Sequence, residues 1–189
     1  AAENLIKNDK AYYCFCTAER LDKLRADQKA KKLPPRYDRL CRNLKRWEID
    51  KRIEAKNRYI IRLKVPESGN ISFKDTVRKQ VEFDLSTIDD QVLIKSDGFP
   101  TYHLASVVDD HNQEVTHVIR GEEWLPSTAK HILLYQGFDW PIPKFVHLPL
   151  MLNPDGGKLS KRHAAVSVKD YIDQGYLPEA LLNFLFLQG

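Results

Sequence analysis

The apolar and polar positions of this 189-residue chain follow two patterns that change near Asp97-Gly98. Before that point, short strand-like segments stand among basic helical ones; after it, strand and helix patterns alternate. The clearest strand of the first part is RYIIRLKV (58–65), where apolar residues occupy alternate positions and the cations Arg62 and Lys64 fall between them. This alternation predicts a half-buried strand with both cations on the face opposite the apolar one.

Turn and capping residues divide the first part further. The expected elements are a helix ending near residue 8, a strand over 10–17, a helix after Thr17, a basic helical stretch over roughly 38–56, and short strands near 71–74, 80–85 and 91–95. Thr17 is a good N-cap, and Pro34-Pro35 ends the helix that follows it.

The second part alternates strands with helices. We expect a helix from Thr101 to about Asp109, a strand over 114–120, a helix from Ser127 to about Gln136 and a strand over 144–149. Such alternation predicts an α/β fold with a parallel sheet and crossover helices.

The last helical segments carry their own capping residues. Ser167 with Asp170 forms a capping pair for a helix that ends near Gly175. Pro178 suits the first turn of a final helix, EALLNFLFLQ. This helix is apolar on nearly every face, so we expect a segment outside the chain to cover it.

Composition limits the class of protein. Charged residues make up 30% and hydrophobic ones 42%, as in a soluble globular protein with one large domain or parts of two. No apolar run reaches the roughly 18 residues of a membrane span, and no signal peptide is recognisable. The chain begins with Ala inside a helix-like pattern, which favours a piece cut from a longer protein. Three cysteines cannot all pair within the chain, which indicates a reducing compartment with free, catalytic or metal-bound thiols.

The net charge of +4 is unevenly distributed. Residues 20–64 hold 17 Lys and Arg against 6 Asp and Glu, whereas the rest of the chain holds 13 against 20. This asymmetry predicts a polyanionic partner for the first third. The alternative is a charge-rich surface that is simply solvated.

The string GGKLSKR, residues 156–162, has the most specific pattern for chemistry. It places three cations and a hydroxyl on one loop, where Lys ammonium groups can stabilise the charge that builds up as a triphosphate loses pyrophosphate. The two glycines allow the loop to close and reopen. It is not a Walker loop, because the G-x-x-x-x-G-K order is missing. An ordinary surface turn is the alternative interpretation.

Cys14-x-Cys16 and Cys41 form a second pattern. Two thiolates one residue apart at a strand end, joined by a third across a loop, can hold zinc tetrahedrally. Three unrelated buried cysteines are the alternative.

Several segments resemble one known family. KLSKR resembles the second signature loop of the class I aminoacyl-tRNA synthetases. The segments 96–111 (SDGFPTYHLASVVDDH), 115–135 (VTHVIRGEEWLPSTAKHILLY) and 175–185 (GYLPEALLNFL) closely resemble bacterial-type glutamyl-tRNA synthetases, including organellar relatives. The resemblance covers essentially the whole chain.

This resemblance implies a fold and its division. It implies the second half of a class I Rossmann-type parallel sheet plus an α+β connective domain that contacts the tRNA acceptor end. The connective domain would span residues 1–100, the second half of the catalytic domain 101–157, and the KLSKR loop with the start of a helical region 158–189.

The resemblance also implies a glutamate site formed by Tyr102, Ser106 and Arg120. Many relatives carry Asn where this chain has Ser106. A guanidinium suits the substrate's side-chain carboxylate, because it is permanently charged and bidentate and rejects neutral glutamine. Arg120 also stands at the end of a predicted strand, where open α/β sheets place ligands. A structural Arg120 that pairs with Glu122 or Asp109 is the alternative.

The ATP site is implied in the same way. Residues around the ribose and adenine would be Glu123, Trp124, Leu150 and Met151; the loop residues Lys158, Ser160 and Lys161 would be catalytic, with both lysines on the phosphates. Mg²⁺ would accompany ATP. Plain core packing is the alternative for Met151. No His stands at a metal-ligand spacing; His131 is expected near the nucleotide, and the other His residues on the surface or in packing.

For zinc, some family members complete the cysteine site with a His two residues after the last Cys, where this chain has Asn43, a poor ligand. Tyr37 matches a Tyr used in a close relative. The implied metal ligands are therefore Cys14, Cys16, Tyr37 and Cys41, with water as the other candidate for the fourth position.

The activity implied is that of a glutamate–tRNA ligase, which activates L-glutamate with ATP and transfers it to the 3′ end of tRNA(Glu). The His-x-Gly-His signature that class I synthetases need is missing from the chain, as is an anticodon-reading domain, so we expect residues 1–189 alone to be inactive. The implied protein is a monomer in a bacterial cytoplasm or an organelle, without a membrane partner.

Three rival interpretations remain. A synthetase that attaches glutamate to the modified base of tRNA(Asp), glutamyl-queuosine, usually has a degraded Lys-Ser loop, and the intact KLSKR argues against it. Glutaminyl-tRNA synthetase has no use for the arrangement around Arg120. A non-catalytic, zinc-stabilised RNA-binding module accounts for residues 10–64 but leaves KLSKR unexplained.

Overall fold

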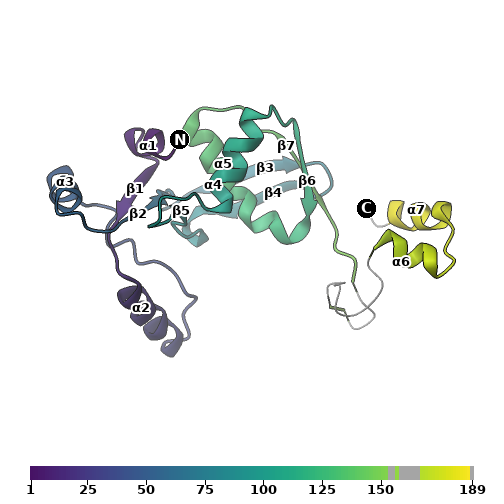
Figure 1. Cartoon of the computed structure of the whole chain (residues 1–189), viewed down its shortest axis with the longest axis horizontal. Helices are drawn as coiled ribbons and strands as arrows, with labels where there is room; N and C mark the ends of the chain where they lie inside the picture. The colour runs from purple at the N-terminus through teal and green to yellow at the C-terminus, as the bar shows by residue number, and fades with distance from the viewer. Residues whose placement is uncertain (153–155, 158–166, 188–189) are drawn as a thin grey trace. The chain divides into compact units, whose positions relative to one another are not determined.

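The computed structural model describes residues 1–152, 156–157 and 167–187 (Figure 1). The chain forms two compact units. The first comprises Ala1–Ser72, Glu82–Val115 and Ser127–Pro143; the second comprises Phe73–Val81, Thr116–Pro126 and the chain from Lys144 on. The units interleave along the sequence, so the predicted division at residues 100 and 157 stays a prediction.

A three-stranded antiparallel sheet lies at the centre of the first unit. Its order is β1 (Ala11–Cys14), β2 (Ile60–Leu63) and β5 (Val92–Ile94). The predicted apolar face of β2 is confirmed, because Ile61 and Leu63 are buried. The predicted half-buried pattern is wrong at Arg62, which lies on the opposite face as expected but is buried there as well. Arg62 is only 5% exposed, since its Nη1 donates to the backbone oxygen of Asp90 at 2.9 Å and its guanidinium lies 4.0 Å from the ring centre of Tyr37.

Five helices belong wholly or mainly to this unit: α1 (Ala2–Lys7), α2 (Ala18–Ala30), α3 (Arg46–Glu54), α4 (Tyr102–Asn112) and α5 (Leu125–Phe138). The predicted cap of α2 is confirmed, because the Thr17 hydroxyl accepts the backbone N–H of Arg20 at 3.3 Å. The predicted helix over 38–56 is wrong for its first half. Residues 38–45 form a loop, and α3 begins only where the carboxylate of Glu48 accepts the backbone N–H of Lys45 at 2.9 Å.

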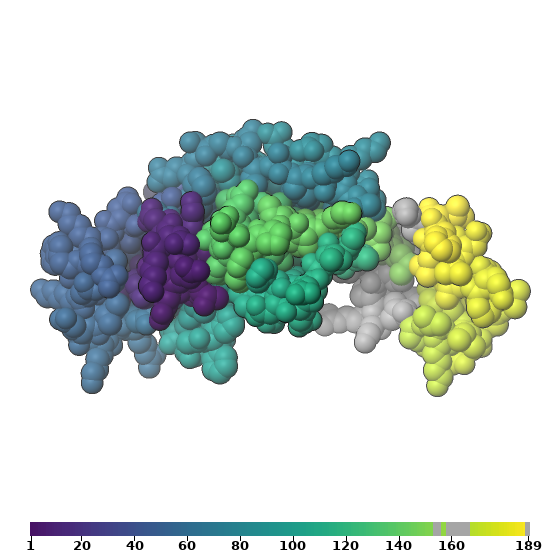
Figure 2. Space-filling view, turned by 90° about the horizontal axis from the view of Figure 1, so that it is seen from above, coloured from purple at the N-terminus to yellow at the C-terminus, as the bar shows by residue number. Residues whose placement is uncertain are grey.

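Helix α1 packs against the end of α5. Leu5 is fully buried, and a Cβ at Gly137 would lie 2.8 Å from its Cδ2 atom. In the space-filling view the purple residues of α1 lie directly against the green residues of α5 (Figure 2). A glycine at position 137 therefore permits the close approach of the two helices. The largest fully buried apolar side chains of the unit are Leu5, Leu63, Val65, Leu93, Val107, Ile132 and Leu134.

A four-stranded sheet contains the strands of the second unit, in the order β4 (Lys79–Asp84), β3 (Asn70–Asp75), β7 (Lys144–Leu148), β6 (His117–Gly121). β6 and β7 are parallel with Arg120 opposite His147, and β3 is parallel to β7 with Asp75 opposite Phe145. The predicted α/β fold with parallel strands is confirmed. Short 3-10 helices follow β4 (Leu85–Thr87) and β6 (Glu122–Trp124).

Two helices end the described chain, α6 (Val168–Asp173) and α7 (Pro178–Phe186). The predicted capping pair is confirmed: Ser167 Oγ accepts the Asp170 N–H at 3.1 Å and an Asp170 carboxylate oxygen accepts the Ser167 N–H at 3.0 Å. Most apolar residues of α7 are exposed, with Phe186 at 75%. Among the described helices, none has the length and apolar character that crossing a membrane requires.

Candidate substrate site and candidate metal site

Arg120 lies near the C-terminal end of β6, directly beside β7. Parallel strands of open α/β sheets present their ligand-binding residues at this end. The parallel register places Arg120 opposite His147, and Asp75 opposite Phe145 on the other side of β7. Because side chains two residues apart share a face of a strand, all four residues lie on one face of the sheet.

A chain of hydrogen bonds crosses this face. Arg120 Nε donates to His147 Nε2 at 3.0 Å, and His147 Nδ1 lies 2.6 Å from Asp75 Oδ2. The side chains of Asp75 and His147 are fully buried. The sequence predicted only a surface or packing role for His147 and none for Asp75. His147 is a polar residue within the predicted strand 144–149, and a buried polar side chain normally has a hydrogen-bond partner. This could have indicated the need for a residue such as Asp75.

Asp75 is held as a carboxylate by its donors. Burial raises the pKa of this carboxyl, but the backbone N–H of Arg78, the ring of His147 and the backbone N–H of Val77 together lower it below its ordinary value. The two backbone groups donate to Oδ1 at 2.9 and 3.0 Å. An ionised carboxylate only accepts hydrogen bonds, so its partner on His147 must be an N–H.

The surroundings of Arg120 are aromatic and acidic. Its guanidinium lies 5.6 Å from the ring centre of Phe145, within the range of a cation–π contact. Glu122, a structural partner considered for Arg120, forms an ion pair with Arg78 and accepts the backbone N–H of Leu150 at 3.3 Å. Glu122 therefore links the turn after β3 to the segment after β7.

The residues predicted around ATP occupy this part of the second unit. Trp124 and Leu150 are half-buried, and Glu123 and Met151 are exposed. The carboxylate of Glu123 folds over Gly121 so closely that a Cβ there would lie 2.0 Å from Oε2. At 40% exposure, Met151 does not have the burial of a core residue. Lys158, Ser160 and Lys161 lie outside the described residues, so their role stays a prediction.

Tyr102 and Ser106 lie on α4, four residues apart, and therefore on one face of that helix. Tyr102 is 53% exposed. The hydroxyl of Ser106 is buried and has no hydrogen-bond partner among the described residues. These two residues belong to the first unit and Arg120 to the second, so their joint contact with one substrate stays a prediction.

His131 of α5 is buried beside this face. Its Nε2 lies 3.0 Å from His103 Nδ1, and its ring centre lies 6.3 Å from that of Tyr102. Whether a nucleotide binds near His131 stays a prediction.

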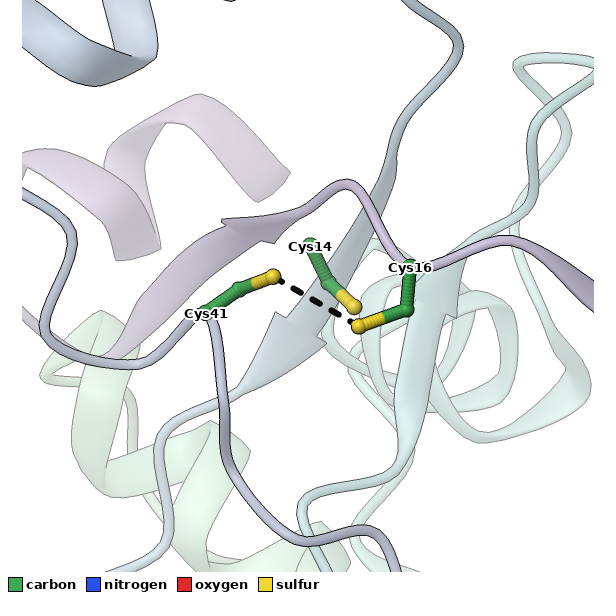
Figure 3. Close-up of side chains that lie close together, drawn as sticks. All are labelled: Cys14, Cys16 and Cys41. Atoms are coloured by element: carbon green, nitrogen blue, oxygen red, sulfur yellow. Dashed lines mark hydrogen bonds between the residues drawn. The ribbon is translucent and has the colours of Figure 1, made fainter. Parts of the chain in front are cut away.

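The three cysteines come together in the first unit (Figure 3). Cys14 ends β1, Cys16 follows it, and Cys41 comes from the loop before α3. Their sulfur atoms all lie within 4.8 Å of one another, and the sulfurs of Cys16 and Cys41 are 3.6 Å apart. The hydroxyl oxygen of Tyr37 lies 3.2 Å from Cys14 Sγ and 3.4 Å from Cys16 Sγ.

This arrangement fits a tetrahedral zinc ion. With Zn–S bonds of about 2.3 Å and a Zn–O bond of about 2.0 Å, tetrahedral geometry separates two sulfurs by about 3.8 Å and a sulfur from an oxygen by about 3.5 Å. The Cys16–Cys41 distance of 3.6 Å lies close to the first value, and the distances from Tyr37 to Cys14 and Cys16 lie close to the second. Asn43 is exposed, whereas the hydroxyl of Tyr37 lies beside the sulfurs of Cys14 and Cys16. Cys14, Tyr37 and Cys41 are also buried together with Tyr12, so core packing stays the alternative to a metal site.

Hydrogen bonding within the cluster sets its protonation. The bond from Cys41 lowers the pKa of the Cys14 thiol against the effect of burial, and Tyr37 contributes in the same direction. The same bond, with burial, raises the pKa of Cys41. Burial and the bonds to Cys14 and Cys16 raise the pKa of Tyr37, whose hydroxyl also accepts the backbone N–H of Cys41 at 3.1 Å. Burial and hydrogen bonds therefore shift the pKa values of Cys14 and Cys41 in opposite directions.

Neighbouring residues contact the sulfur atoms of the cluster. Arg20 Nη1 donates to Cys16 Sγ at 3.5 Å while the same guanidinium forms an ion pair with Asp38. The backbone N–H of Phe15 donates to Cys41 Sγ at 3.4 Å. Such outer partners fix ligand geometry. Arg20 was not among the predicted residues of this cluster, although it follows Cys16 by four positions at the start of a predicted helix.

The basic stretch 20–64 divides into two groups in the structure. Arg39 and Arg42 pair with the fully buried Asp90 at 3.3 and 2.8 Å, so their charges serve the fold. The exposed cations of the stretch include Lys29, Lys31, Lys32, Lys45 and Arg46. Only this second group can meet a polyanion.

Comparisons with known proteins agree with one another. Residues 1–189 match the family described as class I tRNA synthetases (E and Q), catalytic domain. The chain is 54% identical over 187 residues to the glutamate–tRNA ligase of Finegoldia magna, and 53% over 188 residues to that of Fusobacterium nucleatum. These alignments cover 99% and 100% of this chain, but 38% and 37% of those relatives.

A solved structure gives the same result. The crystal structure of a glutamate tRNA ligase from Elizabethkingia meningosepticum, in complex with its amino acid, has a TM-score of 0.83 and 41% identity to this chain. The match covers 97% of this chain and 41% of that one. The chain spans less than half the length of these relatives, and over its full length it belongs to the catalytic-domain family of the class I tRNA synthetases for glutamate and glutamine.

Proposed function

We propose that residues 1–189 form part of a glutamate–tRNA ligase. The α-carboxylate of glutamate would attack the α-phosphate of ATP, giving glutamyl-adenylate and pyrophosphate. A hydroxyl of the 3′-terminal ribose of tRNA(Glu) would then take the glutamyl group, and AMP would leave. The observation that carries the proposal is Arg120, a guanidinium held at the C-terminal end of a parallel strand by His147 and Phe145. The chain itself supplies only part of the relatives' length, so we expect it to be inactive alone.

Arg120 would bind the side-chain carboxylate of glutamate. The hydrogen bond to His147 uses Nε. The two terminal nitrogens of the guanidinium would match a carboxylate bidentately. Glutamine would present an amide group with two N–H donors to a guanidinium that only donates. The site would therefore discriminate against glutamine, because N–H groups of the amide and of the guanidinium would face each other without an acceptor.

Tyr102 and Ser106 would complete the glutamate site. The unpartnered, buried hydroxyl of Ser106 supports this role, because a substrate group can supply the missing hydrogen bond. The exposed ring of Tyr102 lies on the same face of α4. Ser106 is shorter than the Asn of many relatives, so it would reach a substrate group directly or through a water.

The ATP site would lie beside Arg120 in the second unit. Glu123, Trp124, Leu150 and Met151 would surround the ribose and adenine, and the link from Glu122 to the Leu150 backbone supports a fixed geometry there. Lys158 and Lys161, with Ser160 between them, would meet the phosphates of an ATP that enters as its Mg²⁺ complex. The two glycines before this loop allow it to close over the nucleotide.

Zinc would be held by Cys14, Cys16, Cys41 and Tyr37. The donor set and its distances support this role: Cys14 and Cys16 on one segment and Tyr37 and Cys41 on the next loop would be tied together. The metal would stabilise the basic segment around it and take no part in the reaction. Exposed cations beside this segment would bind the acceptor-end phosphates of tRNA(Glu). The location that fits such an enzyme is a bacterial cytoplasm or an organelle.

The function is tested with Arg120→Ala. The assay needs a protein as long as the relatives, with residues 1–189 in the place where they align. We call this protein the full-length ligase. We expect glutamate-dependent ATP–pyrophosphate exchange, measured with tRNA(Glu) present, to lose at least about a hundredfold in kcat/KM for glutamate, because a substrate charge is left unpaired. The folded fraction, followed by circular dichroism, should not change.

A matched control removes an exposed cation elsewhere. Lys95 is half-exposed and pairs only locally, with Asp97, so Lys95→Ala should leave the exchange unchanged. If Arg120→Ala retains glutamate activation, Arg120 is structural and the proposal fails. Charging of tRNA(Asp) instead of tRNA(Glu) would favour the related enzyme that modifies a tRNA base.

A further inference from the structure

Three adjacent strands bring Asp75, His147 and Arg120 into one row on one face of the sheet. Asp75 and His147 are separated by 72 residues in sequence, yet both side chains are fully buried and bonded at 2.6 Å. Phe73 and Phe145 lie next to the imidazole, with ring centres 6.5 and 6.1 Å away. A polar pair kept inside an aromatic environment is costly unless its hydrogen bonds are made.

The donors and acceptors of this row determine the His147 tautomer. Asp75 is a carboxylate and only accepts, so Nδ1 of His147 carries the proton. Arg120 only donates, so Nε2 of His147 carries the lone pair that receives its Nε–H. The imidazole is therefore neutral, with one tautomer selected from both sides.

We propose that Asp75 and His147 are positioning residues for Arg120: the buried carboxylate selects the tautomer whose Nε2 lone pair holds the Nε edge of the guanidinium, which directs the terminal nitrogens toward the glutamate carboxylate. This inference rests on the proposed function of Arg120. Two contacts at different angles restrain the guanidinium, the in-plane bond to His147 and the face of Phe145. The site thus binds its substrate without first having to order a long side chain.

Asp75→Asn tests the idea, because it keeps the shape and changes one group. Oδ1 of Asp75 accepts the N–H groups of Val77, Arg78 and, at 3.4 Å, His147. Those donors require the oxygen of an asparagine at the same place, so its NH₂ must face His147 Nδ1. The ring must then carry its proton on Nε2, where it opposes the Nε–H of Arg120.

Two measurements follow this change. On the ¹⁵N-histidine-labelled chain, NMR shifts of the His147 ring nitrogens should show Nδ1–H in the parent and Nε2–H in Asp75→Asn. In the full-length ligase, Asp75→Asn should raise KM for glutamate about tenfold or more, while KM for ATP changes less than twofold. A merely structural defect would affect both substrates.

A double-mutant cycle asks whether the effect passes through Arg120. In an Arg120→Lys background the Nε–H is gone, so adding Asp75→Asn should change KM for glutamate less than twofold. An Nε2–H tautomer in the parent would overturn the inference. So would a tautomer change without a change in glutamate KM, or an undiminished effect in the Arg120→Lys background.

If Asp75→Asn does not fold, two substitutions of His147 take its place. His147→Gln keeps one donor and one acceptor, whereas His147→Phe keeps only the aromatic packing. Gln should retain a lower KM for glutamate than Phe, and equal values would overturn the inference. The proposed function is tested separately: an Arg120→Ala ligase with unchanged glutamate KM would reject the function and leave the tautomer result standing.

Discussion

The buried carboxylate of Asp90 makes the most informative stability prediction. It is fully buried in the first unit and receives four hydrogen bonds or ion pairs. Oδ2 accepts from the hydroxyl of Tyr12 and from Arg42 Nη1, both at 2.8 Å; Oδ1 accepts the backbone N–H of Val65 and faces Arg39 Nη2, both at 3.3 Å. These contacts fasten the loop that carries Tyr37 and Cys41 to the sheet.

The expected cost of Asp90→Asn follows from what it leaves behind. The side chain of Arg42 is 7% exposed, so removing its counter-charge leaves a buried cation uncompensated, which costs about 3–5 kcal/mol. Glu67 lies 3.7 Å from Arg42 but is 70% exposed, and such a partner compensates little. Asparagine still offers one acceptor oxygen. We therefore expect a loss of about 3 kcal/mol in the free energy of unfolding.

Urea unfolding followed by circular dichroism measures the loss. The matched control is Asp50→Asn, which removes an exposed carboxylate 3.0 Å from Arg46 and should cost no more than about 0.5 kcal/mol. Replacing Arg42 with Met in the Asp90→Asn protein should recover part of the loss, because the stranded charge is removed. A loss below about 1 kcal/mol, or one equal to that of the control, would refute the assignment of Arg42 and Asp90 as a structural pair.

Three further outcomes are expected. Thr17→Ala removes the side-chain acceptor at the start of α2 and should cost about 1 kcal/mol in thermal unfolding; Thr17→Ser should cost less. Tyr37→Phe should weaken zinc binding, measured by competition with a chromogenic chelator, by tenfold or more if the phenol is the fourth ligand; unchanged affinity would assign that position to water. Replacing the exposed Lys29, Lys31 and Lys32 with Gln should lower the slope of log affinity for tRNA(Glu) against log salt by up to about 2–3; an unchanged slope would leave these charges without a role in RNA binding.

Periodicity predicted most strands and helices of this chain because it is a local property. The alternation of β2, the Thr17 cap of α2 and the Ser167–Asp170 pair all act within a few residues. The cysteine cluster was also predictable, since thiols at close spacing suggest a metal without knowledge of the fold.

The missed features depend on partners that are distant in sequence. Arg62 looked like a solvent-facing cation in an alternating strand, but Asp90 and Tyr37 arrive from other segments to bury it. Similarly, β3 looked like one of several short strands in the first part, whereas its last residue lies opposite Phe145 in a parallel sheet. Neither the contacts of Arg62 nor the pairing of β3 with β7 can be recognised from the local sequence pattern. Both depend on segments that only the whole fold brings together.

The same physical rule separates a structural arginine from the proposed substrate-binding arginine in this chain. Both Arg42 and Arg120 depend on a buried carboxylate, but they are connected to it differently. Arg42 contacts Asp90 directly and is itself buried, so the carboxylate offsets its charge and the contact serves the fold. Arg120 reaches Asp75 through a neutral imidazole. A neutral imidazole brings no counter-charge, so this hydrogen bond directs the guanidinium without itself neutralising it. An arginine oriented in this way retains the electrostatic attraction that a carboxylate substrate requires.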